Sequence, residues 1–361
     1  MDFLNLIELE DAARERLATN AYGYIRGGCE DEICLRENRS AFGRLQLVPR
    51  VLVDVSEPDL SIELLGRQLD MPVLLAPVAF QVLAHADGEL ASARAAAAAG
   101  TIFVASTLSS HPMDAIAHAS NGGKWFQLYC SRDRGRTGAM LARAEDLGYE
   151  AVCMTVDVPV AALREADERN RFHLPPAALP GNLIADMAPD ALRGKESGSA
   201  LVRLVGDTFD PALTWRDVER LRASTKLPFL IKGILSAEDA LLALEHGAQG
   251  VVVSNHGGRQ LDCAPASIDV VAEIAAAVDG RAAVLLDGGV RRGSDVVKAM
   301  ALGADAVLIG RPMVWGLAIG GEAGVTQVLS LLAAEIKRTL ALLGRPSLVD
   351  LEPSMVRGPR A

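Results

Sequence analysis

The stretch LLALEHGAQGVVVSNHGGRQLD, residues 241–262, contains a helical segment, a glycine, an apolar strand and a polar turn in direct succession. The apolar run 250–253 predicts a short buried strand. Where it stops, His256 and Arg259 flank two glycines, which let a backbone turn tightly and approach a ligand closely. A structural turn is the alternative for an isolated histidine. The pattern indicates a proton acceptor and an anion-binding cation in one pocket.

The same unit of strand, turn, Ala-rich helix and glycine recurs from residue 71 onward. It appears as ASARAAAAAGTIFVAST (91–107), ARAEDLGYEAVCMTV (142–156), LLALEHGAQGVVVS (241–254) and KAMALGADAVLIG (298–310). Gly100, Gly148, Gly247 and Gly303 stand where each helix should end. The strands are continuously apolar, which is typical of a parallel sheet covered on both faces.

Eight candidate strands follow from this pattern: 73–76, 102–105, 125–128, 152–155, 229–231, 250–253, 284–286 and 306–309. Eight parallel strands with intervening helices predict an α/β fold, a closed (β/α)8 TIM barrel. An open doubly wound sheet is the alternative, because periodicity alone does not show closure. We expect a single domain over 1–361, with a helical and hairpin extension at 1–70 and the barrel at 71–345.

Segments outside the repeats have their own signals. Residues 4–19 predict a helix, and a Leu-Gly-Arg turn at 65–67 between short apolar runs predicts a hairpin. About sixty residues separate the fourth strand from the next helix, and they include Pro175, Pro176, Pro180, Pro189 and a GKESGSA segment, so we expect a lid-like loop. Near the end, 324–344 carries apolar residues at helical spacing and predicts a core-facing helix.

Composition narrows the function classes. The net charge is −10 and no Lys/Arg-rich block occurs, which argues against a nucleic-acid partner. The N-terminal residues are neither a signal peptide nor a membrane span, and no membrane-inserting segment is expected. Five cysteines without CxxC spacing predict reduced thiols, no metal site and a cytoplasmic protein.

Active sites of such barrels lie at the carboxyl ends of the strands, and the residues there are unusually polar. In chain order they are Pro77, Val78, Ala79, Ser106, Gln127, Tyr129, Thr155, Asp157, Lys232, Ser254, His256, Arg259, Asp287, Arg291, Gly310 and Arg311. Each alone has a structural explanation, such as a capped turn or a solvated lysine. Together they place a base, an acid and several cations at one barrel mouth.

Two of these segments predict a phosphate site. DGGVRRG (287–293) and IGRP (309–312) follow the seventh and eighth strands, where this fold commonly binds phosphate. Their glycines offer backbone N–H groups, and Arg291 and Arg311 can bind phosphate bidentately. Neither a GxGxxG after the first strand nor a GxxxxGK[ST] motif occurs, so Rossmann and P-loop sites lack their signature.

With these residues in view, the chain resembles the FMN-dependent 2-hydroxy-acid oxidase and dehydrogenase family from about Tyr22 to near Gly344. The segments SNHGGRQLD, FQLY, TVD, KG, LDGGVRRG and IGRP stand in the family's order. The resemblance implies FMN as the cofactor. It assigns FMN to Pro77, Val78, Ala79, Ser106, Gln127, Thr155, Lys232, Ser254, Asp287, Gly289, Arg291, Gly310 and Arg311, with the phosphate on the last four.

The resemblance also implies a catalytic set. His256 would be the base, Asp157 would stabilise its imidazolium, and Tyr129 would face the substrate hydroxyl. The substrate carboxylate would be held by Arg164, Arg259 and Tyr24. Whether His256 removes the α-proton or the hydroxyl proton stays open.

Departures from the family pattern bear on the substrate. Leu108 stands where many members carry a tryptophan, Ala162 replaces the first of two arginines, and Val160 and Ala161 are small. A roomier apolar pocket is implied, which favours aryl or bulky (S)-2-hydroxy acids of the mandelate or 4-hydroxymandelate type over glycolate or lactate.

The resemblance bears on the electron acceptor as well. Ala79 stands where oxidases of the family tend to carry alanine, so we expect O2 as acceptor and H2O2 as product. The alternatives are a dehydrogenase that reduces a quinone or protein, a non-redox FMN barrel, and a silent binding barrel. By analogy with the family we expect a homotetramer.

Overall fold

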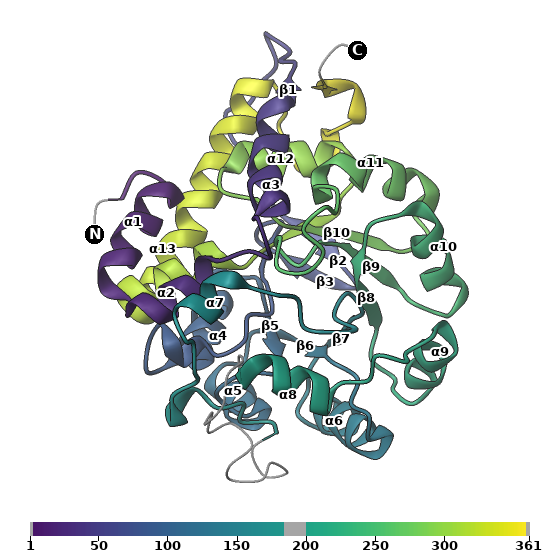
Figure 1. The fold of residues 1–361 in the computed structure, drawn as a ribbon. Coiled ribbons are helices and arrows are strands. Elements are labelled where there is room, and N and C mark those ends of the chain that lie inside the picture. Colours follow the sequence, from purple (N-terminus) through teal and green to yellow (C-terminus); the bar gives the residue numbers. More distant parts are fainter. Residues whose placement is uncertain (1–2, 184–199, 359–361) are drawn as a thin grey trace.

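The computed structural model describes residues 3–183 and 200–358, and eight parallel strands form a closed barrel within them (Figure 1). Each predicted strand is present, with ends that differ by no more than a few residues. The barrel strands are β4 Val73–Leu75, β5 Ile102–Ser106, β6 Gly123–Leu128, β7 Ala151–Thr155, β8 Phe229–Ile234, β9 Gly250–Val253, β10 Ala283–Asp287 and β11 Ala306–Ile309. Because β11 pairs with β4, the sheet has no open edge, and the doubly wound alternative is excluded.

Helices cover the outside of the barrel. They are α4 Gly88–Ala98, α5 Met113–Ala119, α6 Arg134–Asp146, α9 Trp215–Ala223, α10 Ala237–Glu245, α11 Ser267–Val278, α12 Gly293–Ala301 and α13 Arg311–Leu343. The four glycines predicted to end helices all have positive φ, from 61° at Gly100 to 103° at Gly303. An L-residue rarely adopts this conformation, so these glycines set the helix ends.

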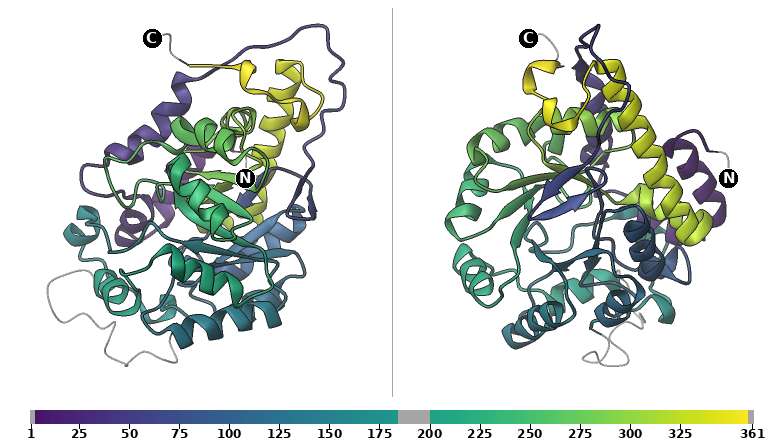
Figure 2. Two further views of the ribbon diagram at one scale, coloured as in Figure 1. Left: turned by 90° about the vertical axis from the view of Figure 1, so that its right-hand side faces the viewer. Right: turned by 180° about the vertical axis from the view of Figure 1, so that it is seen from behind.

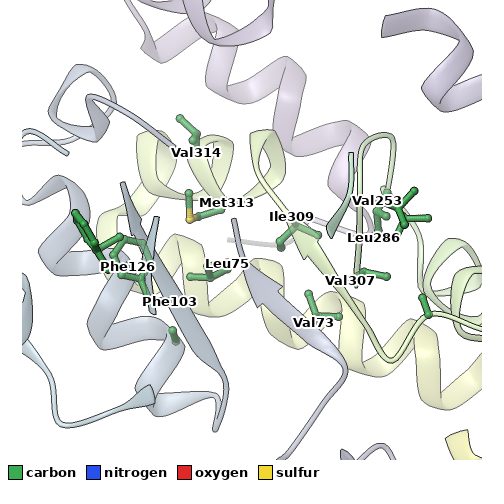
Figure 3. Close-up of a cluster of buried hydrophobic side chains, with 14 of the residues drawn as sticks. Val73, Leu75, Phe103, Phe126, Val253, Leu286, Val307, Ile309, Met313 and Val314 are labelled. Atoms are coloured by element: carbon green, nitrogen blue, oxygen red, sulfur yellow. The ribbon is translucent and has the colours of Figure 1, made fainter. Parts of the chain in front are cut away.

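Successive side chains of each strand point to opposite faces of the sheet, so the hydrophobic core has two parts. Leu74 points into the barrel and belongs to an interior cluster with Ile102 and Leu230. Its neighbours Val73 and Leu75 point outward and pack beneath the helices, together with other strand residues and side chains of α13 (Figure 3). Strands buried on both faces explain why the sequence runs are continuously apolar.

The N-terminal extension lies against the barrel (Figures 1 and 2). It comprises α1 Leu6–Arg16, α2 Thr19–Arg26, α3 Ile33–Arg44, β1 Gln46–Leu47, β2 Ile62–Leu64 and β3 Arg67–Leu69. The predicted hairpin is confirmed as β2 and β3, and its Leu64 and Leu69 join the interior cluster of the barrel. The hairpin therefore contributes to the barrel core.

The single helix predicted over 4–19 is wrong in its limits. Helix α1 ends at Arg16, Leu17 is extended at φ −82° and ψ 144°, and α2 begins at Thr19. The break turns the chain, so that Tyr22 and Tyr24 lie on α2. Tyr22 packs on Trp315, with ring centroids 5.6 Å apart.

The long connection after β7 contains α7 Glu165–Arg169, the 3-10 turn η2 Pro176–Ala178 and α8 Ala200–Thr208. The described parts therefore contain regular structure, and most of the GKESGSA segment lies outside the described residues. The remaining elements are η1 Gln81–Leu83, η4 Leu348–Asp350, η5 Pro353–Met355 and β12 Val356–Arg357, which pairs with β1.

Helix α13 is the one helix of the described chain with the length and composition of a membrane span. It is interrupted by non-helical backbone at Gly320 and Gly321. The predicted stripe is buried throughout: Val325, Val328, Leu329, Leu332, Ile336, Leu340 and Leu343. This helix therefore packs as a core helix against α1, α4 and α12.

All five cysteines are free thiols, as predicted. Four are buried and Cys263 is exposed. Burial raises the pKa of Cys34 to about 11, so this thiol stays protonated at neutral pH.

Candidate active site

A cavity of about 1210 Å³, open to solvent, lies at the carboxyl ends of the barrel strands. Most of the predicted site residues line it. They are Tyr24, Pro77, Val78, Ala79, Ser106, Leu108, Tyr129, Arg164, Lys232, His256, Arg259, Asp287, Gly289, Arg291, Gly310 and Arg311. The closed barrel brings these residues together because parallel strands end at the same rim.

Four predicted site residues are not among those that line the cavity. Gln127 accepts a hydrogen bond from Ser106 Oγ at 3.0 Å and donates one to Thr155 Oγ1 at 3.0 Å. Ser254 is fully buried, and its hydroxyl accepts from Lys232 Nζ and from the backbone N–H of His256. Asp157 lies beside His256. These side chains fix the orientation of the groups that do face the cavity.

His256 and Asp157 form the predicted pair. Nδ1 of His256 lies 2.9 Å from Asp157 Oδ1, and Nε2 lies 3.5 Å from the hydroxyl of Tyr129. A proton on Nδ1 that is shared with the carboxylate leaves Nε2 free to accept another from the cavity. Although burial opposes ionisation of Asp157, His256 and Lys232 hold the pKa of this carboxyl below its usual value. The pair has the form of a general base with its stabilising acid.

Lys232 lies at the cavity floor and is 4% exposed. Its ammonium group is 3.0 Å from Asp287 Oδ2 and 2.8 Å from Ser254 Oγ. Burial alone would lower the pKa of Lys232, but the carboxylates of Asp287 and Asp157 raise it above the usual value. The structure therefore excludes a solvated lysine and shows a permanent buried positive charge.

The guanidinium groups of Arg259 and Arg164 both lie over the aromatic ring of Tyr24, and all three residues line the cavity. Arg259 and Arg164 have their Cζ atoms 5.0 and 5.4 Å from the centre of the Tyr24 ring, which itself stacks on Phe172 at 4.5 Å. Burial, together with Arg164, lowers the pKa of Arg259, and Arg164 Nε pairs with Asp167 at 3.1 Å. Arg164 and Arg259 carry two positive charges, and Asp167 supplies one negative charge beside them. The remaining positive charge suits a carboxylate ligand.

Arg291 and Arg311 also line the cavity. Neither forms an ion pair with a carboxylate of the described residues. Arg291 donates to Val290 O, and Arg311 donates to the backbone oxygens of Ile25, Gly27 and Gly257. Burial lowers the pKa of Arg291 to about 10, and burial together with Arg259 and Arg291 lowers the pKa of Arg311. Two buried guanidinium groups that lack an ion pair with a described carboxylate favour binding of an anion such as a phosphate.

These groups match the donors that FMN requires. Arg291, Arg311 and the backbone near Gly289 and Gly310 offer a phosphate site, and Lys232 offers a cation deeper in the cavity. Asp287 Oδ1 is buried without a hydrogen-bond partner among the described residues. A hydroxyl of the ribityl chain would supply the missing donor.

We expect Arg291→Met to change FMN affinity and apoprotein stability in opposite directions. Loss of the cation should weaken FMN binding about tenfold or more, because a charge-assisted hydrogen bond to phosphate is lost. The apoprotein should be at least as stable as the wild type, because an unneutralised cation is removed. FMN titration and thermal unfolding of the apoprotein check both effects, and a destabilised apoprotein would contradict the assignment.

The cavity also includes apolar residues that sequence reasoning missed. Val205 and Phe209 come from α8 and the residue after it, and Val158 follows β7. The ring of Phe209 lies 4.7 Å from that of Tyr129. Helical spacing of four between Val205 and Phe209 was the only available signal, in a segment interpreted as a loop.

The fold and site define a class, that of (β/α)8 barrels with a phosphate site after the last two strands and a His–Asp pair at the mouth. The model of the FMN-dependent dehydrogenase family matches residues 13–358, and the chain belongs to this family. FMN is therefore its cofactor.

Relatives and solved structures agree with this membership. The chain is 50% identical to L-lactate oxidase of Nostoc sp., and the alignment covers 98% of each chain. It is 45% identical to glycolate oxidase 1 of Oryza sativa subsp. indica, and that alignment covers 97% of this chain and 94% of the relative. A crystal structure of mandelate oxidase with (S)-4-hydroxymandelic acid matches at TM-score 0.94 and 44% identity over 99% of each chain.

Proposed function

We propose that this protein oxidises (S)-2-hydroxy acids to 2-oxo acids with FMN and passes the electrons to O2, which forms H2O2. The observation that carries the proposal is that His256, supported by Asp157, lines the same cavity as the two guanidinium groups on Tyr24. A base and a carboxylate-binding site in one cavity suit a substrate whose reacting carbon is adjacent to a carboxylate. The relatives named above are oxidases of such acids.

The chain's own residues would bind the substrate and move its proton. Arg164, Arg259 and Tyr24 bind the carboxylate, which directs the α-carbon toward His256. Tyr129 donates to the substrate hydroxyl, since burial raises the pKa of this phenol and keeps it neutral. Nε2 of His256 accepts the proton that leaves the substrate, and Asp157 stabilises the imidazolium.

When bound, FMN would supply the two-electron redox chemistry between the α-carbon of the substrate and O2. Lys232 would favour negative charge on the cofactor, as preorganised electrostatics. Pro77, Val78 and Ala79 line the wall after β4. The methyl group of Ala79 supports O2 as acceptor rather than a quinone or a protein partner.

We propose an aryl or bulky side chain for the substrate. In addition to the guanidinium groups, apolar side chains line the cavity: Leu108, Val158, Ala161, Val205 and Phe209. Burial of an aromatic ring against such a surface is favourable. Mandelate oxidase, with (S)-4-hydroxymandelic acid in its crystal structure, supports this choice. The 50% identity to a lactate oxidase supports a small acid as the alternative.

The direct test measures O2 consumption and peroxide formation with S-mandelate, 4-hydroxymandelate, lactate and glycolate. We expect stoichiometric peroxide, with the highest kcat/KM on the aryl acids. Anaerobic bleaching of the flavin followed by slow reoxidation in air would indicate a dehydrogenase instead. A preference for lactate would retain the oxidase and overturn the aryl substrate.

We expect Leu108→Trp to separate the substrates by size. Leu108 is 5% exposed and lies on the cavity wall, so an indole there would occupy space meant for the substrate side chain. We predict that kcat/KM on mandelate falls about tenfold or more, while that on lactate changes little, because steric exclusion acts on the larger side chain. Equal losses on both acids would contradict a size effect.

We also propose a cytoplasmic homotetramer. Reduced thiols favour a cytoplasmic location, and the assembly rests on the family analogy. Light scattering of the purified protein tests the assembly.

A further inference from the structure

Helix α3 of the N-terminal extension contacts two loops of the barrel mouth through successive residues. Asn38 reaches the loop after β9, which carries His256, and Arg39 reaches the loop after β10, which carries Arg291. Neither residue is among those that line the cavity. The roles proposed above do not account for these contacts.

Asn38 forms a reciprocal amide pair with Asn255, the residue before His256. Each side chain donates to the other's oxygen at 2.8 Å, and the two are 2% and 3% exposed. Asn255 also donates to Pro265 O at 2.9 Å and accepts from the N–H of Gly258 at 3.2 Å. Buried amides are costly to leave unpaired, so this pair fixes the loop on both sides of His256.

His256 depends on such support because its backbone is unusual. Its φ is +57°, in the left-handed region that non-glycine residues seldom adopt. The surrounding structure must hold the residue there. Asn38 provides part of that constraint from a separate helix.

Arg39 acts on the second loop. Its guanidinium donates to Gly289 O and pairs with Asp295 at 2.8 Å. The same Asp295 oxygen accepts the backbone N–H groups of Arg291 and Arg292 at 2.9 and 3.0 Å. Gly289 packs so tightly on α3 that a Cβ there would lie 1.8 Å from Asn38 O. Arg39 therefore sets the backbone that presents Arg291.

We propose that α3 is a positioning element with two separable functions: Asn38 positions the catalytic base and Arg39 positions the phosphate site. The inference rests on the proposed function, since it assigns roles relative to the base and to FMN. It predicts that substitutions at these two adjacent residues affect different quantities, kcat for Asn38 and FMN affinity for Arg39. A helix that served only stability would not show this separation.

Asn38→Ala should lower kcat at saturating FMN about tenfold to a hundredfold, the scale that a small misplacement of a reacting group can cost. KM should stay within about twofold, because Arg164 and Arg259 are untouched. FMN affinity should be nearly unchanged. The isosteric Asn38→Asp keeps the volume but places a carboxylate oxygen against Asn255 Oδ1, and it should also lower kcat if the amide pair matters.

Arg39→Leu should give the opposite result. The apoprotein should bind FMN about tenfold more weakly, measured by quenching of flavin fluorescence, since the backbone around Arg291 loses its support. At saturating FMN, kcat should stay near that of the wild type. Ser40→Ala changes an exposed residue of the same helix and serves as the matched control, with neither quantity altered.

The outcomes separate the two proposals. Loss of both FMN affinity and kcat in both variants would reduce α3 to a structural role and overturn the inference. Wild-type kcat in Asn38→Ala and Asn38→Asp would also overturn it. A wild-type protein without activity on any 2-hydroxy acid would overturn the proposed function, while FMN titration of Arg39→Leu would still test the phosphate loop.

Discussion

The His256→Gln variant should keep its FMN and lose about 10²- to 10⁴-fold in kcat on 2-hydroxy acids, the usual contribution of a general base. Glutamine retains a polar side chain of similar length but has no basic nitrogen. The Nε2 atom of His256 is free to take a proton because Nδ1 is engaged by Asp157 Oδ1 at 2.9 Å. Steady-state kinetics with peroxide detection, together with flavin absorbance for FMN content, measures both quantities.

Variants at a second histidine and at Asp157 test whether the loss of kcat is specific to the His256–Asp157 pair. His118→Gln alters an exposed histidine on α5 and should leave kcat unchanged. Asp157→Asn should also reduce kcat strongly, because an amide N–H facing Nδ1 favours the tautomer whose Nε2 is already protonated. Retention of more than about a tenth of kcat in His256→Gln would assign the base elsewhere.

The barrel was predictable because its signal is local. Short, mainly apolar runs identify the strands, four glycine-terminated helices mark the repeating unit, and eight strands leave few alternatives. The polar residue at each strand end then falls on a common rim. The N-terminal helix was predicted less well, because the break at Leu17 has neither proline nor glycine to mark it. Packing of α1 on α13, which local sequence does not show, accompanies the break.

Residues that act from a distance were missed for a related reason. Asn38 lies more than two hundred positions from Asn255, and a polar residue on a helix usually indicates a solvated face. Phe209 lies in a connection that was interpreted as a lid-like loop. Pairing of these residues with the site depends on tertiary contacts.

Lys232→Met should cost about 3–5 kcal/mol of apoprotein stability, the usual penalty when one partner of a buried ion pair is removed. The ammonium group of Lys232 is 3.0 Å from Asp287 and also offsets the charge of Asp157. Methionine keeps the apolar stem, so lost packing is a small part of the effect. FMN affinity should fall as well, and urea unfolding and FMN titration measure the two losses.

The pH dependence of this stability difference has a defined sign. The folded-state pKa of Lys232 is raised above its ordinary value of 10.5. A group of this kind contributes stability that is fully present below the unfolded-state pKa and is lost as the pH rises through the folded-state value. The difference between wild type and Lys232→Met should therefore be flat from neutral pH up to about 10. A difference that already declines near neutral pH would contradict a permanently charged lysine.

A double variant distinguishes a lost charge pair from general damage to the barrel floor. In Lys232→Met the carboxylate of Asp287 is left without its cation, and its Oδ1 already has no hydrogen-bond partner within residues 3–183 and 200–358. Asp287→Asn in the same chain removes that uncompensated charge, so the double variant should be more stable than Lys232→Met alone. Additive losses would mean that the two side chains act independently. Lys226→Met, which alters an exposed lysine before β8, should leave stability unchanged and completes the comparison.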